Sequence, residues 1–410
     1  MKIAIVAIGT RGDIQPCVAL ANELKKMGSN VFIATFKEYK ILVESNNIDY
    51  KEMPNNPANR SMENNGNKSA LKLETYLKIW LNKSLEICSN SDALIYTPPF
   101  IVGAHLAERL KIPFFPVIFE PSIKTNEFPS PHQPILYERN RMFNKFSYYL
   151  TDFLFWNRMK KRINQLRTGI LNLPPLKVNP YNEMIEKKIP FLACYSANLI
   201  PKPKDWYDDI QVNGYWYLDA KEEQESIIKK LEDYLGKGNK PIFIDFGSFS
   251  NKAIQKQLLY IIEDLKNSNE RFIIDLGKLT AEDLQLPANS FLLNNNVSHK
   301  WLLPKVKAII MHGGVGVTHA ALKAGIPSIP IAIIGTQYFW GEKLFKLGLG
   351  TKPIRIRKLK QGDLLQAITY LNKNKEIFTN VFKFKEKIKN EKGSEVTANF
   401  IISYMKNYLS

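Results

Sequence analysis

The chain has 410 residues and a formal net charge of +18, from 57 Lys and Arg against 39 Asp and Glu. Hydrophobic residues make up 45% of it, which excludes a disordered chain, and its length predicts two domains of about 200 residues each. The three cysteines lie too far apart for a metal site, no signal segment opens the chain, and the apolar stretches are too short to span a bilayer. We therefore expect a cytoplasmic protein with at most peripheral membrane contact.

The positive charge predicts attraction to an anionic partner such as a nucleotide diphosphate, an anionic lipid surface or a nucleic acid. Charge alone does not choose among these partners, because much of the excess is Lys scattered beside Asn and Ile, as on an ordinary solvated surface. No nucleic-acid-binding signature is present, so nucleic acid is not an expected partner.

The chain opens with a βαβ pattern. Residues 2–8 form an apolar, β-branched run, residues 9–14 read as a turn, and Pro16 suits the first position of a helix that stops at Gly28. Residues 30–35 then read as the next strand. Such a crossover predicts a parallel sheet, in which ligands bind beyond the carboxyl ends of the strands.

Asp13 stands out in the first turn. The glycines Gly9 and Gly12 do not spell the dinucleotide-binding pattern, so a dinucleotide site is disfavoured. A carboxylate at this edge of a sheet can cap the following helix or can face a cleft as a general base. From the residue alone, capping is the favoured interpretation.

Further apolar runs at residues 93–96 and 114–119 predict more strands of the same sheet. Residues 135–167 differ, since they mix many aromatic residues with many Arg and Lys. We interpret their helically spaced apolar residues as the buried side of one or two helices, and keep a membrane-facing surface as the alternative. These residues are Tyr137, Phe143, Phe146, Leu150, Phe153 and Phe155.

The strand and helix pattern restarts after a charged, helix-prone stretch at residues 219–235 and a Gly-rich turn at 236–239. The restart predicts a second doubly wound domain. Its expected strands are residues 241–246, 271–276, 306–311 and 328–333, with a helix at residues 252–267.

The most informative stretch is residues 311–325, an apolar strand that breaks into a Gly-rich turn and opens a helix from about Val317. Gly313, Gly314 and Gly316 allow close backbone approach, and free N–H groups at the helix start favour an anion. Close packing of the helix on the sheet is the alternative explanation. The position of His312 directly before two glycines favours phosphate contact, whereas His299 is a weaker candidate and His319 is expected to be structural.

Five segments occur in an order typical of one known family. They are residues 9–16 (GTRGDIQP), 193–206 with 214–216 (ACYSANLIPKPKDW and GYW), 246–248 (FGS), 297–304 (VSHKWLLP) and 312–327. On these segments the chain resembles the nucleotide-sugar-dependent glycosyltransferases of the sterol glucosyltransferase and antibiotic glycosyltransferase type. The resemblance implies the GT-B arrangement, in which two Rossmann-like domains face each other across a cleft. It covers nearly the whole chain.

The resemblance also implies a separate role for each segment of the chain. Residues 1–217 are expected to bind the acceptor, 218–239 to link the halves, 240–380 to bind the nucleotide sugar, and 381–410 to form terminal helices that can cross back to the first domain. Asp13 takes the position of the general base, without metal or cofactor. The other implied site residues are Ser248, Val297, Ser298, Trp301, His312, Gly314, Gly316, Val317 and Thr318 for the nucleotide and diphosphate, Thr336 and Gln337 for the donor sugar, and Arg11, Gly12 and Ile14 for the acceptor-side loop.

Three positions depart from the family pattern. Val317 stands where a Thr is common, so one hydroxyl donor to the diphosphate is missing, and Thr318 is the nearest hydroxyl that could replace it. Thr336 stands where an acidic residue usually binds the hydroxyls of the donor sugar. Val297 stands where related plant enzymes have a Trp that stacks on the base. A neutral hydroxyl accepts hydrogen bonds less strongly than a carboxylate, so the sugar preference is left open.

The expected function is inverting transfer of a hexose, with glucose as the expected sugar, from a nucleoside diphosphate sugar, expected to be UDP-linked, to a hydroxyl of a lipophilic acceptor. Two alternatives are kept: a nucleotide-sugar epimerase or hydrolase with the same two-domain layout, and a catalytically weak nucleotide-binding or lipid-binding protein. The sequence names neither the acceptor nor the oligomeric state.

Overall fold

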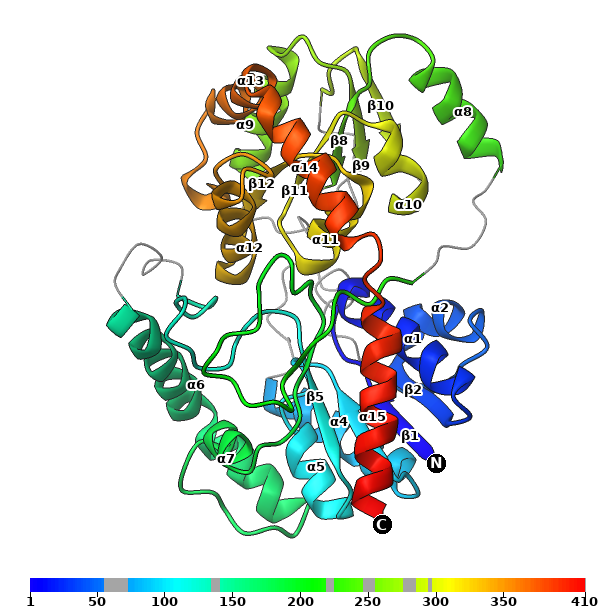
Figure 1. Cartoon of the computed structure of the whole chain (residues 1–410), viewed down its shortest axis with the longest axis vertical. Coiled ribbons are helices and arrows are strands. Elements are labelled where there is room, and N and C mark those ends of the chain that lie inside the picture. The colour runs from blue at the N-terminus through cyan, green and yellow to red at the C-terminus, as the bar shows by residue number, and fades with distance from the viewer. Residues whose placement is uncertain are drawn as a thin grey trace. The chain divides into compact units, whose positions relative to one another are not determined.

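The computed structural model describes residues 1–54, 73–133, 141–218, 225–245, 255–275, 285–293 and 297–409 (Figure 1). The chain divides into two compact units, one formed by Met1–Leu218 with Glu391–Ser410 and the other by Asp219–Asn390. The expected linker at residues 218–239 is therefore assigned mostly to the second unit, which contains the helix α8 (Glu225–Leu235). The chain returns to the first unit at Glu391, later than the expected boundary at residue 381.

The first unit contains a parallel sheet with the strand order β3-β2-β1-β4-β5-β6-β7 among the described residues. Its first five strands follow the 3-2-1-4-5 order of a Rossmann-like sheet. This result confirms the expected βαβ start and the expected strands near residues 93 and 114. The strands are β1 (Lys2–Val6), β2 (Asn30–Phe36), β3 (Asp49–Met53), β4 (Ala93–Tyr96), β5 (Phe114–Ile118), β6 (Leu192–Ala193) and β7 (Gln211–Val212).

Helix α1 (Arg11–Lys26) begins earlier than expected. The expected turn at residues 9–14 is mostly its first turn, and the prediction that Pro16 opens the helix is wrong, because Pro16 lies inside it. The cause is local: the Asp13 carboxylate accepts a hydrogen bond from the Thr10 backbone N–H at 2.6 Å, which satisfies one donor at the helix start. The helix can therefore begin at Arg11.

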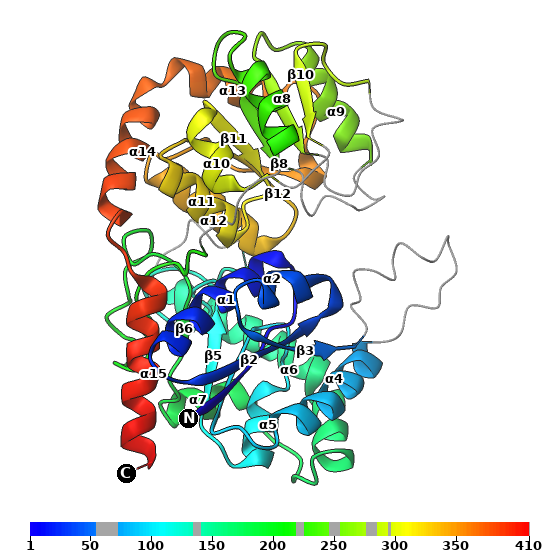
Figure 2. The same cartoon turned by 90° about the vertical axis from the view of Figure 1, so that its right-hand side faces the viewer.

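The helices of the first unit include the C-terminal helix α15, which packs along α1 (Figure 2). The Glu391 carboxylate, just before α15, accepts hydrogen bonds from Ser196 at 2.5 Å and Asn198 at 2.7 Å. These bonds attach the last segment of the chain to residues that lie almost two hundred positions earlier in the sequence. The other helices are α2 (Lys40–Glu44), α4 (Leu73–Cys88), α5 (Gly103–Leu110), α6 (Arg141–Gly169) and α7 (Pro180–Glu186), and α15 spans Gly393–Leu409.

Helix α6 corrects the preferred interpretation of residues 135–167. The aromatic side chains Phe143, Phe146, Phe153 and Phe155 are exposed instead of buried, and Tyr137 lies outside the described residues. A different set of side chains packs into the core. It consists of Tyr148, Trp156, Met159, Ile163 and Leu166. The helix therefore has two apolar faces, and the periodicity of the sequence did not reveal which of them the fold covers.

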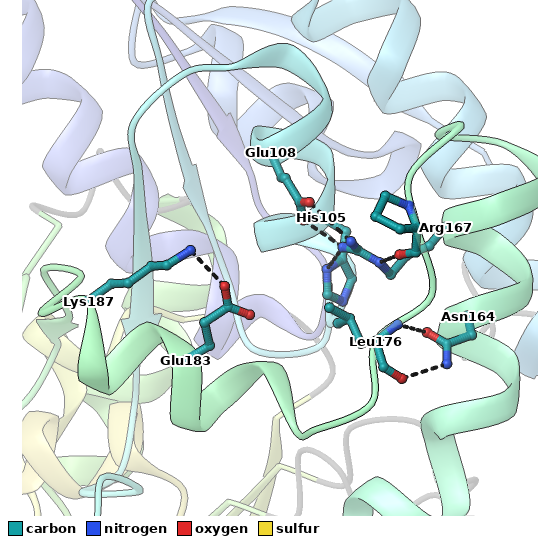
Figure 3. Close-up of polar contacts among 8 residues, drawn as sticks. His105, Glu108, Asn164, Arg167, Leu176, Glu183 and Lys187 are labelled. Atoms are coloured by element: carbon teal, nitrogen blue, oxygen red, sulfur yellow. Dashed lines mark hydrogen bonds and ion pairs between the residues drawn. The ribbon is translucent and has the colours of Figure 1, made fainter.

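The end of α6 is held by a buried guanidinium (Figure 3). Arg167 donates to both carboxylate oxygens of Glu108 at 2.6 and 3.0 Å, and to the Pro174 carbonyl at 2.9 Å. Its Nη1 also lies 3.0 Å from His105 Nδ1, which must act as the acceptor because guanidinium cannot accept. Burial, assisted by the Arg167 charge, lowers the pKa of His105 to about 4, so His105 is neutral in this cluster.

The second unit contains a parallel sheet with the strand order β10-β9-β8-β11-β12-β13 in its described part. This is the 3-2-1-4-5-6 order of a Rossmann-like domain, so the expected second doubly wound domain is confirmed. The strands are β8 (Ile242–Asp245), β9 (Phe272–Asp275), β10 (Ser290–Leu293), β11 (Ala308–Met311), β12 (Ser328–Ala332) and β13 (Ile354–Arg355). Its helices besides α8 are α9 (Gln255–Lys266), α10 (His299–Leu302), α11 (Val315–Ala324), α12 (Gly335–Lys346), α13 (Asp363–Lys373) and α14 (Lys375–Ile388).

Candidate active site

Asp13 lies in the first turn of α1, beyond the carboxyl end of β1. Its Oδ2 accepts from the Thr10 backbone N–H at 2.6 Å and from the Thr10 hydroxyl at 2.9 Å, so the capping interpretation is confirmed. Burial nevertheless raises the pKa of Asp13 from 3.8 to about 6, although both hydrogen bonds lower it. A carboxyl group with this pKa is a stronger base than an ordinary aspartate and is still mostly ionised at neutral pH.

A second carboxyl group interacts with Asp13 and was missed by the sequence analysis. Glu120 follows β5, two strands away from β1 in the sheet, so both residues lie at the same edge. Burial raises the pKa of Glu120 to about 7, and the Asp13 charge adds to the increase. His132 is close by, with its Nε2 3.7 Å from Glu120 Oε1, and burial lowers the pKa of His132. The available signal was an acidic residue directly after a buried strand.

The three residues expected in the acceptor-side loop lie in α1 around Asp13. Arg11 and Gly12 are exposed at the helix start, and Arg11 Nε donates to Gln15 at 3.4 Å. Ile14 is fully buried in the core, so it supports the helix from beneath and does not present its side chain to solvent.

In the second unit, His312 follows β11 and leads into α11, which begins at Val315, two residues earlier than expected. Gly313 has a φ of 81°, a conformation that favours glycine. A Cβ atom on Gly313 would lie 2.8 Å from the Gln337 carbonyl oxygen, and one on Gly314 would lie 2.5 Å from His312 Nε2. The turn thus needs a glycine at 313, and a side chain at 314 would displace the His312 ring, which the turn places next to the start of α11.

The His312 side chain is partly buried, and its Nδ1 is buried without a hydrogen-bond partner among the described residues. Burial lowers the pKa of His312, while the charge of Asp245 at the end of β8 opposes the decrease. His299 Nε2 lies 3.5 Å from Asp245 Oδ2. Asp245 and His299 therefore form a polar pair next to the turn, and no motif of the sequence pointed to Asp245.

The residues expected at the donor sugar, Thr336 and Gln337, lie in the first turn of α12. The Gln337 side-chain oxygen accepts from the backbone N–H groups of Ile333 at 2.8 Å and Ile334 at 3.2 Å, so these two bonds do not use the donors of the side-chain amide nitrogen. Because Gly313 packs against the Gln337 backbone, the structure brings the expected sugar residues beside the expected diphosphate turn.

The segment expected to bind the base opens α10, which packs against α11. Val297, Ser298 and Trp301 are all partly exposed there. The Ser298 hydroxyl caps α10 by accepting from the Trp301 N–H at 3.4 Å, and Lys305 Nζ lies 3.7 Å from the centre of the Trp301 ring.

Two expected contacts are not presented to solvent. Val317 is buried, and Thr318 is fully buried with its hydroxyl unpartnered within the described ranges, so the Thr318 side chain does not replace the missing hydroxyl at the helix start.

The expected role of Gly316 rests on its place in the first turn of α11, where backbone N–H groups lack helical partners. His319 is structural as expected, since its Nδ1 lies 2.8 Å from the Val315 carbonyl oxygen and its ring meets Trp340 edge-on. Ser248 lies outside the described residues.

Comparison with known proteins bears on both units. Residues 3–129 match the glycosyltransferase family 28 N-terminal domain. Sterol 3-beta-glucosyltransferases of Arabidopsis thaliana and Cryptococcus neoformans are 33% and 30% identical over 90% of this chain. The chain thus carries a glycosyltransferase family 28 domain and is similar to sterol 3-beta-glucosyltransferases over most of its length. A spinosyn rhamnosyltransferase complexed with thymidine diphosphate has the same two-domain fold, with a TM-score of 0.66, 15% identity and coverage of 98% of this chain and 100% of that one.

The chain spans only part of the curated relatives that it matches, namely 60% of the Arabidopsis protein and 25% of the Cryptococcus protein. In the described part of the chain, no helix is long and apolar enough to cross a membrane. The same residues contain no group of three or more His, Cys, Asp and Glu side chains arranged to hold a metal ion.

Proposed function

We propose that this protein transfers glucose from UDP-glucose to a hydroxyl of a sterol or a similar lipophilic acceptor. The observation that carries the proposal is the Gly-rich turn between β11 and α11, where the buried His312 Nδ1 has no partner among the described residues and lies beside helix N–H groups that lack helical partners. The 33% identity with a sterol 3-beta-glucosyltransferase supports the choice of sugar and acceptor. The buried, unpaired Cys17, Cys88 and Cys194 are consistent with the cytoplasm as the site of the reaction.

Asp13 is proposed as the general base. The acceptor oxygen attacks the anomeric carbon from the face opposite the diphosphate, a new C–O bond forms, and the bond to the diphosphate oxygen breaks with inversion. The acceptor proton passes to Asp13 as the new bond forms, since the hydroxyl becomes acidic only then. The raised pKa of Asp13, about 6, supports this role because it improves the carboxylate as a proton acceptor without protonating it at neutral pH.

The leaving UDP gains negative charge, and we propose that the start of α11 stabilises it through the N–H groups of Gly314 and Gly316 and through His312. Ser248, Val317 and Thr318 are the remaining proposed residues of the diphosphate site, with backbone contact for the latter two because their side chains are buried. Neutral donors and a helix start make a divalent metal unnecessary in this proposal. Transfer is therefore expected to persist in EDTA.

The nucleoside is proposed to lie against α10, where Val297, Ser298 and Trp301 are partly exposed. The donor sugar is proposed to contact Thr336 and Gln337, and the acceptor to enter beside Arg11 and Gly12. No family carboxylate is present at the Thr336 position, so glucose is proposed on the strength of the relatives rather than of this residue.

The decisive experiment is a mass-spectrometric screen of UDP-linked and dTDP-linked sugars against a mixed library of sterols and other lipophilic alcohols. We expect a hexose adduct with UDP-glucose in the wild type, and loss of transfer with retained UDP binding in Asp13→Asn. Glu186→Gln is a matched control, because Glu186 is an exposed acid at the end of α7 in the first unit. Sugar release or isomerisation without an acceptor would identify a hydrolase or epimerase. UDP binding without consumption of any donor would identify a binding protein.

A further inference from the structure

One face of α6 exposes a row of large apolar side chains. Phe146 is 56% exposed and Phe153 is 62% exposed, and Tyr149 and Leu154 are also more than half exposed. Steps of three and four residues separate Phe146, Tyr149 and Phe153, so these side chains lie along one side of the helix. We call these four residues the α6 stripe. Met142 and Phe143 extend it toward the start of the helix, where both are exposed.

The α6 stripe is separate from the side of α6 that enters the core. The buried residues Trp156, Met159, Ile163 and Leu166 repeat with the same spacing; Trp156, three residues after Phe153, borders the stripe, and the other three lie farther around the helix. The stripe is therefore not needed to attach α6 to the first unit. Exposure of a contiguous aromatic row costs solubility and marks an interaction surface.

The charges around the stripe favour an anionic occupant. Lys160 and Lys161 continue the stripe side of the helix and are exposed. Seven of the 29 residues of α6 are Arg or Lys, and Asp152 is its single acidic residue. Asp152 is already paired with Lys124 at 3.0 Å, and the Lys124 ammonium also lies 4.4 Å from the Tyr149 ring centre.

We propose that the α6 stripe docks this protein on an anionic lipid bilayer, with the aromatic side chains at the level of the headgroups and the lysines against the lipid phosphates. An aromatic face bordered by lysines is the pattern of helices that lie in a membrane interface. A second copy of this chain is disfavoured as the occupant, because a symmetric contact would place two strongly positive surfaces together. Docking itself does not depend on sugar transfer. Its use, the capture of a membrane-dissolved acceptor, rests on the proposed function.

The test measures binding of the full chain to sterol-free vesicles by flotation. The vesicles contain phosphatidylcholine alone or with about 30% phosphatidylserine, at about 0.1 M salt. We expect the wild type to bind the anionic vesicles, and the double variants Phe146→Ser/Phe153→Ser and Lys160→Glu/Lys161→Glu to bind at least about tenfold more weakly. Thermal melts establish that each variant is folded.

Matched controls remove exposed residues of the same kind from the second unit. Phe382 on α14 is 61% exposed, and Lys229 and Lys230 form an exposed pair on α8. Phe382→Ser and Lys229→Glu/Lys230→Glu should bind the anionic vesicles as the wild type does. Equal losses in stripe and control variants would show that general charge or hydrophobicity, and not the α6 stripe, drives binding, and would overturn the proposal.

Other outcomes also decide the matter. Absence of wild-type binding to anionic vesicles refutes docking. If the protein forms a dimer without lipid and Phe146→Ser/Phe153→Ser is monomeric, a second copy of the chain is the occupant of the stripe. Transfer to a detergent-dispersed acceptor separates docking from catalysis, since the stripe variants should retain it while they lose transfer to vesicle-embedded acceptor. Vesicle binding without transfer to any acceptor would leave docking intact and refute the proposed function alone.

Discussion

The hydrogen bond between the Thr10 hydroxyl and Asp13 offers a direct test of the proposed base. Thr10→Val removes the donor 2.9 Å from Asp13 Oδ2 but leaves the backbone N–H at 2.6 Å. A hydrogen bond to a charged group contributes about 1.5–3 kcal/mol, and the exposure of Thr10 lets water replace part of it, so we take about half. The loss should raise the pKa of Asp13 by about 0.5–1 unit.

The pH profile of kcat/KM for sugar transfer measures this shift, because it reports ionisations of the free enzyme. With a wild-type pKa of about 6, Asp13 is half ionised at pH 6, and the variant should be only about 10–25% ionised there. Transfer at pH 6 should therefore fall about two- to fivefold, while at pH 8 it should change by less than about 10%. Thr10→Ser keeps the hydroxyl and should retain the wild-type profile.

An acid limb of the Thr10→Val profile that coincides with that of the wild type would show that the Thr10 hydroxyl does not set the pKa of Asp13. An equal shift in Thr10→Ser would show the same. A uniform loss at every pH would indicate misplaced residues at the start of α1 instead of an altered pKa. Asp13 would then have to be tested as a structural cap.

Three further predictions follow from the same structure. The pKa of Glu120 is raised from 4.5 to about 7, so Glu120 destabilises the folded state increasingly as the pH rises from about 4.5 to 7. The free energy of unfolding of Glu120→Gln, measured in urea, should therefore rise relative to that of the wild type by up to about 3 kcal/mol between pH 5 and 8. A difference that does not change with pH would contradict this prediction. Arg167→Met leaves the Pro174 carbonyl unpaired and should lower the free energy of unfolding by about 2–4 kcal/mol, whereas a loss below about 1 kcal/mol would show that the cluster is dispensable. Gly313→Ala should weaken UDP binding measured by calorimetry and destabilise the fold more than Gly28→Ala, because both glycines have a positive φ but only Gly313 has a backbone oxygen within 3 Å of the added Cβ.

Local sequence was sufficient for most of the architecture. Strands such as β4 (Ala93–Tyr96) and β12 (Ser328–Ala332) are buried on both faces, so they appear as uninterrupted apolar runs that need no long-range information. The Gly-rich turn before α11 was equally legible, since a left-handed φ at Gly313 demands a glycine wherever the rest of the chain lies. Resemblance to a family added the roles of the site residues, which periodicity could not supply.

Contacts between distant segments needed the tertiary structure. Asp13 influences the pKa of Glu120 across 107 positions of sequence only because β5 lies two strands from β1 in the sheet, and that order is set by how the crossover helices pack. Helix α6 carries two apolar faces of similar spacing, and burial of Met159 with exposure of Phe153 depends on which face meets the sheet core. Side-chain pattern specifies that a face is apolar, whereas the free energy of burying it depends on the surface that the rest of the fold places against it.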